Sequence, residues 1–348
     1  MKNYDAIIVG AGPAGSTLAR LLPKDWKILL IDGRVPGGKP CGGLLAPDAQ
    51  KALARFDLTL PKAVLVDPQI FSVKTIDVAT GLVRWYPRTY LNVNRDAFDS
   101  WLIGLLGDNV QVLRGRCARV ERRDGGYCAH ILEGGQQWSA CAPVLVGADG
   151  AASVVRRCLF PELRTRRYVA IQQWFGAGAA AVNPFYSCIF DPLATDCCSW
   201  SIHKDGMLIF GGAFPAKGCR AAFEAHKKRL QRFGFDLEKP VRTEACVVLR
   251  PTGPRSFETG RQGAYLVGEA AGFISPSSLE GISSAMLSAE ALAGSLRKEN
   301  PARAYRRATE KLRIKLLMKN LKCPFMYVPV LRHLVMRSGL TALRVVPR

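Results

Sequence analysis

The chain has 348 residues, of which 48% are hydrophobic, and a formal net charge of +21. This composition excludes a disordered protein and allows about two domains, or one large nucleotide-binding domain with a second lobe inserted. No run of about 18 uncharged apolar residues occurs, so the sequence predicts no membrane-spanning helix.

The first element is a short apolar run at residues 4–9, which is typical of a buried parallel strand. A glycine-rich turn follows, then a helix at residues 16–22 and a second apolar strand at residues 27–31 that ends at Asp32. Strand, turn, helix, strand and acid stand in the order of a Rossmann βαβ unit. The sequence therefore predicts an α/β fold with a dinucleotide site at its N-terminus.

The turn carries the motif Gly10-x-Gly12-x-x-Gly15. Gly10 permits the tight turn, Gly12 lets the backbone approach a pyrophosphate, and Gly15 lets helix and strand pack closely. Asp32 stands 20 residues after Gly12, where its carboxylate can accept hydrogen bonds from a ribose diol. The residues expected to bind the cofactor here are Gly10, Gly12, Pro13, Ala14, Gly15, Asp32, Gly33 and Arg34. They do not by themselves separate FAD from NAD.

The rest of the chain alternates between helices and strand-rich stretches. Helices are expected at residues 48–56, 95–106, 219–233, 281–296 and 302–321. Antiparallel strands are expected between residues 63 and 93, as a hairpin at 117–138 and at 169–214, and buried strands at 144–146 and 264–267.

We expect an FAD-binding domain of residues 1–62, 91–165 and 245–300, a β-rich substrate domain of residues 63–90 and 166–244, and a basic C-terminal helical region of residues 301–348.

The N-terminus enters the first strand with no room for a signal peptide, so we expect a cytoplasmic protein. The eleven cysteines are an odd number in a reducing compartment, and we expect most of them to be small buried hydrophobic residues rather than disulfides. No CxxC pair or Cys/His cluster has the spacing of metal ligands, so no metal site is expected.

Two later segments resemble flavin fingerprints of proteins built like aromatic hydroxylases. Residues 146–150, Val-Gly-Ala-Asp-Gly, resemble their ADG motif, and residues 268–272, Gly-Glu-Ala-Ala-Gly, resemble their GDAAG motif. The resemblance implies FAD as the cofactor, with Glu269, one methylene longer than the usual Asp, accepting from a ribityl hydroxyl. It further implies that Gly281 opens a helix whose N–H groups face the flavin ring. The flavin-site residues implied are Arg95, Asp149, Gly150, Glu269, Ala270, Gly272, Gly281 and Ile282.

The segment Lys39-Pro40-Cys41-Gly42-Gly43 resembles the KPCGG segment of the geranylgeranyl reductase family. From there the chain is similar, over almost its whole length, to the CbrA-like branch of that family, for example at residues 68–75 and 168–175. The resemblance implies that these five residues lie at the flavin. It implies for Cys41 a role as proton donor or as a residue stacked on the flavin; a packed, inert cysteine is the other interpretation.

Residues 198–203, Cys-Ser-Trp-Ser-Ile-His, stand where the family's reductases carry a YxWxFP segment. Trp200 is expected to act in catalysis as a wall of the substrate pocket, with a core position as the alternative, and His203 is expected at the surface.

Gln172 and Trp174 are expected on one face of a strand, with Gln173 on the other. The glycines at 176 and 178 are expected to end a strand rather than to bind a second nucleotide, so NAD(P)H or a protein electron donor must reduce the flavin.

The resemblance favours a flavin-dependent reductase that adds hydrogen across a carbon–carbon double bond of an isoprenoid or other lipid-like substrate. The alternatives are a flavin-dependent monooxygenase or halogenase, and a flavin-bound, membrane-associated stress protein without turnover. No acidic residue follows Glu310, and Ile314, Leu317, Leu321 and Phe325 share an apolar face that can lie on a membrane or dock on the protein's own core. Too few aromatics stand among these basic residues for nucleic-acid binding. The expected location is cytoplasmic or peripheral on the inner membrane face.

Overall fold

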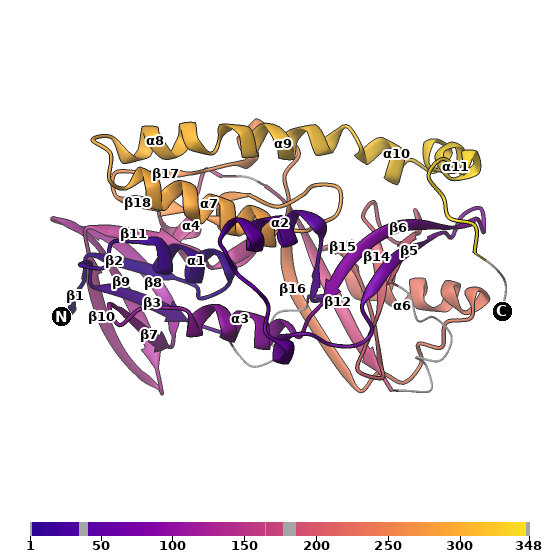
Figure 1. Cartoon of the computed structure of the whole chain (residues 1–348), viewed down its shortest axis with the longest axis horizontal. Helices are drawn as coiled ribbons and strands as arrows, with labels where there is room; N and C mark the ends of the chain where they lie inside the picture. Colours follow the sequence, from indigo (N-terminus) through magenta and orange to yellow (C-terminus); the bar gives the residue numbers. More distant parts are fainter. Residues whose placement is uncertain (1, 35–40, 164, 177–185, 346–348) are drawn as a thin grey trace. The chain divides into compact units, whose positions relative to one another are not determined.

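The computed structural model describes residues 2–34, 41–163, 165–176 and 186–345. The chain forms two compact units, each assembled from three segments. The first unit is Met1–Pro36, Phe98–Arg166 and Leu249–Met318, and the second is Gly37–Ala97, Arg167–Val248 and Lys319–Arg348. Figure 1 colours the chain along its sequence, so that both units show segments of several colours.

The first unit is built on a six-stranded sheet in the order β17-β18-β11-β2-β3-β7. All neighbours in it are parallel except the pair formed by β17 and β18. Its strands are β2 (Ala6–Val9), β3 (Ile28–Asp32), β7 (Val110–Arg114), β11 (Val144–Gly147), β17 (Gly260–Arg261) and β18 (Ala264–Leu266). Every residue of β2 and β3 is buried, as expected of central strands of a parallel sheet.

Helices and a second sheet complete the core of the first unit. The second sheet has the order β1-β10-β9-β8, with β1 (Lys2–Asn3), β8 (Arg116–Arg123), β9 (Gly126–Glu133) and β10 (Gln136–Ala142). The helices are α1 (Pro13–Leu21), α4 (Val154–Leu159), α7 (Ile282–Ser295) and α8 (Pro301–Ala308), with short 3₁₀ turns at Gly150–Ala152 and Gly268–Ala271. One hydrophobic core joins Leu18 of α1, Leu292 of α7 and Ile131 of β9 to the central strands.

The second unit is built on the sheet order β16-β12-β15-β14-β13-β5-β6-β4. Its strands are β4 (Leu44–Leu45), β5 (Ile70–Asp77), β6 (Val83–Asn92), β12 (Arg166–Phe175), β13 (Tyr186–Phe190), β14 (Ser199–Lys204), β15 (Met207–Pro215) and β16 (Arg242–Arg250). Its helices are α2 (Pro47–Arg55), α6 (Cys219–Leu230), α10 (Cys323–Tyr327) and α11 (Pro329–Ser338). Helix α6 packs Phe223 and Leu230 against Phe210 and other buried residues of the sheet. Helices α3 (Arg95–Gly104) and α9 (Glu310–Asn320) cross from one unit to the other.

The α/β class and the interrupting β-rich lobe are confirmed, but several elements differ from the sequence-based expectation. The helix expected at residues 302–321 divides at Thr309, whose hydroxyl donates to the carbonyl of Tyr305 at 2.9 Å. The hairpin expected at residues 117–138 has a third strand, β10, because Gly134 and Gly135 adopt positive φ angles and turn the chain again. Strand β16 was not anticipated, whereas helices α10 and α11 lie within the helical region expected at residues 301–348.

The compact units also divide the chain at other positions than the expected domains. Residues 37–62 belong to the second unit, where β4 pairs with β6. Residues 301–318 belong to the first unit, where the Tyr305 hydroxyl donates to the Leu266 carbonyl at 2.9 Å. The last segment belongs to the second unit, where Arg332 forms a buried ion pair with Asp77 at 2.9 Å. The C-terminal region is therefore shared between the units and is not a body of its own.

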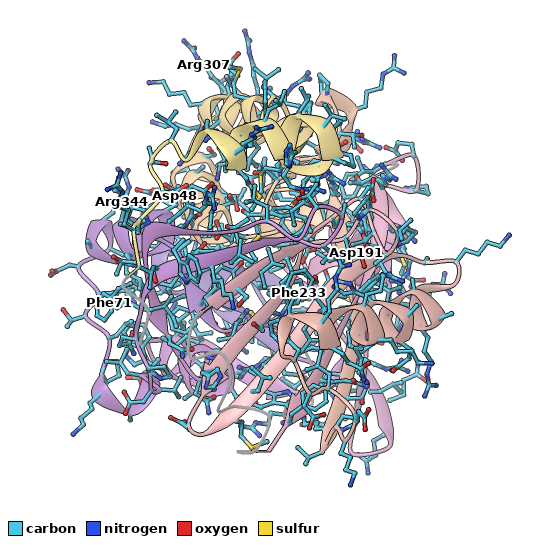
Figure 2. The ribbon with its side chains drawn as sticks, turned by 90° about the vertical axis from the view of Figure 1, so that its right-hand side faces the viewer. Asp48, Phe71, Asp191, Phe233, Arg307 and Arg344 are labelled. Carbon is cyan, nitrogen blue, oxygen red and sulfur yellow. A yellow bond between two sulfur atoms is a disulfide. The ribbon has the colours of Figure 1, made fainter. Side chains whose placement is uncertain are left out.

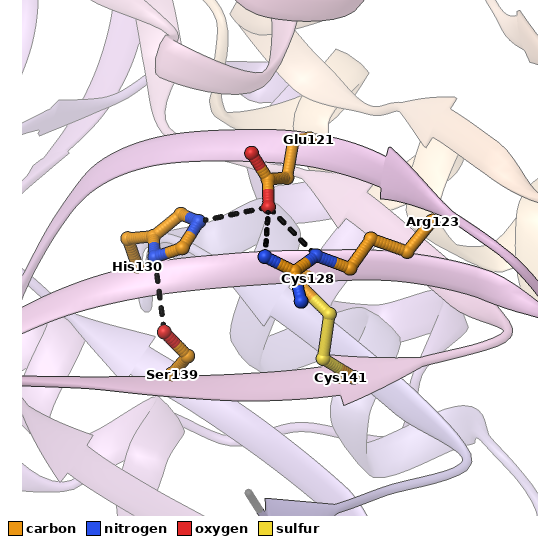
Figure 3. Close-up of a disulfide and its surroundings, with 6 residues drawn as sticks. All are labelled: Glu121, Arg123, Cys128, His130, Ser139 and Cys141. Atoms are coloured by element: carbon orange, nitrogen blue, oxygen red, sulfur yellow. Dashed lines mark hydrogen bonds and ion pairs between the residues drawn. A yellow bond between two sulfur atoms is a disulfide. The ribbon is translucent and has the colours of Figure 1, made fainter.

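One disulfide is an exception to the expectation that most cysteines are small buried hydrophobic residues rather than disulfides. Cys128 of β9 and Cys141 of β10 stand opposite each other in the register of the antiparallel pair, and their sulfurs are bonded (Figure 3). The figure also shows Glu121 of β8 accepting from His130, which in turn contacts Ser139 at 2.9 Å. The pairing register, which the sequence does not reveal, brings the two sulfurs together.

Candidate functional site

The glycine-rich turn joins β2 to α1 in the first unit. Gly10 has a φ angle of +105°, and a Cβ there would lie 2.6 Å from the carbonyl oxygen of Ala148. A Cβ at Gly15 would collide with the carbonyl oxygen of Gly10, whereas a Cβ at Gly12 would meet nothing within 4 Å. Pro13 and Ala14 open α1, and no side chain caps this helix. The first N–H groups of α1 therefore remain available to an anion on the open side of Gly12.

Asp32 ends β3, the strand beside β2, and its carboxylate is buried. Arg34 donates to both of its oxygens at 2.8 Å, and Gly33 between them is exposed. Burial opposes ionisation of this carboxyl, but the hydrogen bonds and charge of Arg34 outweigh it and lower the pKa of Asp32. An ionised carboxylate has about four acceptor positions, so Asp32 can accept further hydrogen bonds beside those from Arg34.

Arg156 of α4 ties the two later fingerprints together within the first unit. Its guanidinium donates to the carbonyl of Ala270 at 3.0 Å and also to the carbonyl of Ala151. The segment that follows β11 is thereby held beside the 3₁₀ turn that carries Glu269. Asp149, in the first of these segments, accepts from the Val154 N–H at 2.6 Å through Oδ2.

One buried polar atom in these segments lacks a partner among the described residues. Oδ1 of Asp149 has no hydrogen-bond partner within the described ranges, and burial raises the pKa of this carboxyl. Gly150 next to it has a φ angle of +71°, a backbone conformation that favours glycine. An unpartnered buried acceptor at the end of a parallel strand is the kind of group that a bound ligand satisfies.

The 3₁₀ turn at Gly268–Ala271 and α7 belong to the same unit. Glu269 is half-buried, and its Oε1 accepts from the backbone N–H of Leu249 at 3.0 Å. Ala270 is fully buried beside it, and a Cβ at Gly272 would collide with the backbone of Ser256. Helix α7 starts after Gly281, at the half-buried Ile282; in this 14-residue helix, too, no side chain caps the N-terminus and the first turn has no acid. The unit thus presents two uncapped helix N-termini and three carboxyl groups at or shortly after strand ends, those of Asp32, Asp149 and Glu269.

The second unit holds Cys41 in an environment of hydrogen-bond donors. The sulfur of Cys41 accepts from the N–H of Gly43 at 3.4 Å and from the Arg95 guanidinium at 3.3 Å. Both contacts favour the thiolate over the thiol. Arg95, one of the flavin-site residues that the resemblance implies, contacts the thiol within the second unit. Lys39 and Pro40, the other expected residues of this segment, lie outside the described residues.

Side chains of strand β14 lie against the segment that carries Cys41. Side chains alternate along a strand, so Trp200, Ile202 and Lys204 share one face. Ile202 and Lys204 are the side chains that a Cβ at Gly42 or at Gly43 would meet. The half-buried ring of Trp200 lies on the same face, against the backbone of Gly211.

Lys204 is a site residue that the sequence analysis did not identify. Its ammonium donates to Asn92 Oδ1 at 2.5 Å, to the Val93 carbonyl at 2.6 Å and to the Gly43 carbonyl at 3.4 Å. Burial lowers the pKa of Lys204 to about 8, while the charges of Cys41 and Asp205 oppose the shift. Because Lys204 precedes the turn at Asp205 and Gly206, its position in the sequence suggested an exposed side chain. Lys204 stands two residues after Ile202 and four after Trp200, and this spacing, which places all three on one face of the strand, could have indicated its position.

A polar chain runs beside Trp200 across three strands of the second unit. The indole N–H of Trp200 donates to Gln172 at 3.4 Å, and Gln172 donates to Glu244 of β16 at 3.1 Å. Trp174 also donates to Glu244 at 3.3 Å, whereas Gln173 contacts Thr243. Gln172 and Trp174 thus lie on one face of β12 and Gln173 on the other. Trp200 is held by a hydrogen bond and packs over a glycine, an arrangement that suits a wall residue.

The other face of β14 corrects the expectation for His203, which is buried and not at the surface. Its Nε2 has no partner among the described residues, and burial lowers its pKa. Strand β14 lies between β13 and β15, and His203 stands opposite Leu208 of β15. This central position in the sheet keeps His203 from water.

On that same face Ser199 contacts His226 at 2.7 Å, and His226 contacts Asp191 at 2.8 Å. Figure 2 shows Asp191 beside α6, the helix that carries His226. The order of groups is that of a hydrolase triad. All three side chains are at most 2% exposed, however, so no substrate reaches them. We interpret this trio as a structural link between α6 and the sheet.

Within the described parts of the chain, no group of three or more His, Cys, Asp or Glu residues could hold a metal ion. No helix there is long and apolar enough to cross a bilayer.

No family model matches the chain. Curated proteins, in contrast, are similar over nearly the whole length. Protein CbrA of Escherichia coli O6:H1 is 49% identical over 347 residues, which cover 97% of this chain and 94% of that protein. Protein CbrA of Escherichia coli O157:H7 is 48% identical over 348 residues, covering 98% of each chain. Protein CbrA of Shigella sonnei is 48% identical, covering 97% and 98%.

Solved structures with a similar fold have lower sequence identity. A geranylgeranyl bacteriochlorophyll reductase-like protein from Thermoplasma acidophilum has a TM-score of 0.77 at 20% identity, covering 93% of this chain and 86% of that one. A flavin-dependent brominase, in a triple mutant, has a TM-score of 0.72 at 17% identity, covering 97% and 93%. A probable FAD-dependent monooxygenase from Pseudomonas aeruginosa has a TM-score of 0.68 at 16% identity, covering 97% and 100%. These similarities establish the fold.

Proposed function

The chain belongs to the CbrA family, and on that basis we propose that it is an FAD-dependent oxidoreductase. The observation that carries the proposal is the open, uncapped N-terminus of α1 after Gly12, with the ionised Asp32 at the end of the next strand. Solved proteins of this fold include ones described as flavin- or FAD-dependent, which supports FAD over NAD.

The residues of the first unit have distinct roles toward the cofactor. The N–H groups after Gly12 bind the pyrophosphate, and Asp32 accepts from the adenosine ribose. Asp149 and Glu269 offer carboxylate oxygens to the rest of the flavin nucleotide. The N-terminus of α7, after Gly281, stabilises negative charge on the flavin ring. Bound FAD supplies two-electron chemistry, taking hydride from a donor and passing it to a substrate.

In the second unit, Cys41 holds the proton that complements hydride transfer. Gly43 N–H and the Arg95 guanidinium both donate to its sulfur and fix its position. Lys204 holds the backbone of the same segment in place. Trp200, positioned by Gln172, forms a wall of the substrate site.

We propose that the substrate is an isoprenoid or other lipid-like molecule with a carbon–carbon double bond. The support is the KPCGG segment, together with the fold of a reductase-like protein that is 20% identical. NAD(P)H or a protein donor supplies the electrons. A peripheral position on the inner membrane face fits such a substrate.

The test is anaerobic incubation of the reduced, FAD-loaded protein with polyprenyl lipids of different head groups, followed by mass spectrometry. We expect a gain of two hydrogen atoms per reduced double bond, and loss of this gain in Trp200→Ala with FAD still bound. No mass gain with any prenyl substrate, from protein whose flavin is reduced and reoxidised normally, contradicts the substrate class. A flavin that no donor reduces would instead favour the stress protein without turnover.

A monooxygenase or halogenase is the second candidate, because proteins described in those terms share the fold over nearly the whole chain. The halogenase version expects a WxWxIP segment, and residues 198–203 lack its first Trp and its Pro. Oxygen uptake by reduced protein separates the candidates: uptake that the substrate accelerates supports oxygenation, and reduced flavin that is stable in air excludes it.

A further inference from the structure

Exposed apolar side chains are concentrated in the C-terminal segment of the second unit. Of the seventeen large hydrophobic residues that are exposed among the described residues, nine lie between residues 319 and 345. Leu321 is 62% exposed and Phe325 is 55% exposed, so this part of the expected apolar face is not buried in a core. We define the tail surface as the exposed side chains of Leu321, Phe325, Val330, Leu334, Leu340 and Leu343.

The opposite side of this segment is firmly anchored. Arg332 of α11 is 3% exposed and donates to Asp77 of β5 and to the carbonyl of Met326, each at 2.9 Å. Met336, one turn further, is buried as well. Val330 and Leu334, also one turn apart, lie on the other side of α11 and are 68% and 58% exposed. Because the helix is fixed by its buried side, the apolar side stays turned toward solvent.

The charge around the tail surface has one sign. No Asp or Glu occurs after Glu310, whereas Lys322, Arg337 and Arg344 are exposed in the same segment as the apolar side chains. Such a segment is attracted to an anionic surface, and each Lys or Arg near a negatively charged leaflet strengthens the attraction. A second copy of the chain would bring like charges together. A nucleic acid would find one exposed aromatic, Phe325, among the described residues of this segment.

We propose that the tail surface docks the protein onto an anionic phospholipid bilayer. Helices α10 and α11 lie in the plane of the interface, with Phe325, Val330 and Leu334 among the acyl chains and the basic residues among the phosphates. The proposal deepens the proposed function, since a lipid-like substrate is reached from such a position, but docking itself does not depend on flavin chemistry.

The experiment is co-sedimentation of the full-length, FAD-loaded protein with vesicles of phosphatidylcholine, with and without a third of phosphatidylglycerol. We expect binding to the anionic vesicles that falls about tenfold or more in Leu334→Asp, because an exposed leucine then no longer inserts. Arg337→Glu lowers binding to anionic vesicles about fivefold or more and makes the remaining binding less sensitive to salt. Phe71→Asp and Leu193→Asp are matched controls, since both side chains are exposed in the same unit at 72% and 80% but lie outside the tail, and both variants bind like the wild type.

Equal binding by Leu334→Asp and by the controls overturns the proposal, as does equal binding to neutral and anionic vesicles. Dimerisation that depends on Leu334 without vesicle binding assigns the surface to a second copy, and preferential retention on RNA assigns it to nucleic acid; either result overturns the bilayer. The flavin content and reducibility of each sample, measured in parallel, keep a failure of docking distinct from a failure of the proposed function.

Discussion

The ammonium of Lys204 lies 2.6 Å from the carbonyl oxygen of Val93, although 111 residues separate them along the chain. The same ammonium reaches Asn92 Oδ1 at 2.5 Å and the carbonyl of Gly43 at 3.4 Å. A single buried cation thereby joins β14, the end of β6 and the segment that carries Cys41. The position of Cys41 therefore depends on a residue far away in the sequence.

This cation makes stability depend on pH. Burial lowers the pKa of Lys204 from 10.5 to about 8, so below that pH the folded protein bears a charged buried lysine at a cost of about 3 kcal/mol. Between these values the unfolded chain binds more protons than the folded one, and the free energy of unfolding rises with pH. We expect this rise in the wild type and not in Lys204→Met, in urea titrations between about pH 8 and pH 10. Parallel curves for the two proteins contradict it.

The rate at which Cys41 reacts with alkylating agents is expected to depend on Arg95, because its guanidinium donates to the sulfur and stabilises negative charge there. Arg95→Gln removes the positive charge, and we expect alkylation of Cys41 by iodoacetamide at pH 7 to slow on the order of tenfold. Peptide mapping by mass spectrometry follows this cysteine, and the exposed Cys158 is the internal control. The same rate in both proteins would show that Arg95 does not influence the thiol.

His226 is expected to support the fold and not catalysis. His226→Ala leaves Asp191 and Ser199 buried without this partner, and we expect a loss of about 3 kcal/mol in the free energy of unfolding, measured in urea. Burial opposes ionisation of Asp191, but hydrogen bonds from His226 and Arg229 outweigh it and lower its pKa. The stabilisation by this pair is therefore complete above the ordinary Asp value of 3.8 and fades as the pH falls below it. A variant as stable as the wild type refutes the structural role.

Gly12 and Gly15 separate cofactor binding from folding. A Cβ at Gly12 meets nothing within 4 Å, so we expect Gly12→Ala to fold with an unchanged free energy of unfolding, within about 0.5 kcal/mol. Its methyl group occupies the side where the pyrophosphate approaches, and we expect at least about tenfold weaker FAD binding in fluorescence titrations. In Gly15→Ala the methyl group collides with the Gly10 backbone, and we expect lower stability as well. Unchanged FAD affinity in Gly12→Ala places the pyrophosphate elsewhere.

The N-terminal unit could be predicted from the sequence because its signals are local. Strand β2, the glycine turn, α1 and β3 follow one another within 32 residues, and Gly10 and Gly15 stand where a side chain would collide with the backbone. The turn between β14 and β15 was likewise readable from Asp205 and Gly206, whose φ angles are positive. Local backbone chemistry sufficed for these elements.

What could not be predicted depends on register and on distant partners. The disulfide between Cys128 and Cys141 requires the pairing of β9 with β10, which the turn at Gly134 and Gly135 determines. Lys204 is buried by contacts with residues such as Val93, which is more than a hundred residues away in the sequence. His203 is buried because β14 lies in the middle of the sheet, beside β15. A lysine beside a turn is usually solvated, so the local sequence wrongly predicts that Lys204 is exposed.

The most direct test of the central claim is the flavin content of the protein. Wild-type protein, as isolated or after incubation with FAD and gel filtration, is measured by its visible flavin absorbance and by mass spectrometry of the released cofactor. We expect one FAD per chain in the wild type and less in Gly12→Ala. Folded protein that stays colourless and takes up no FAD contradicts it.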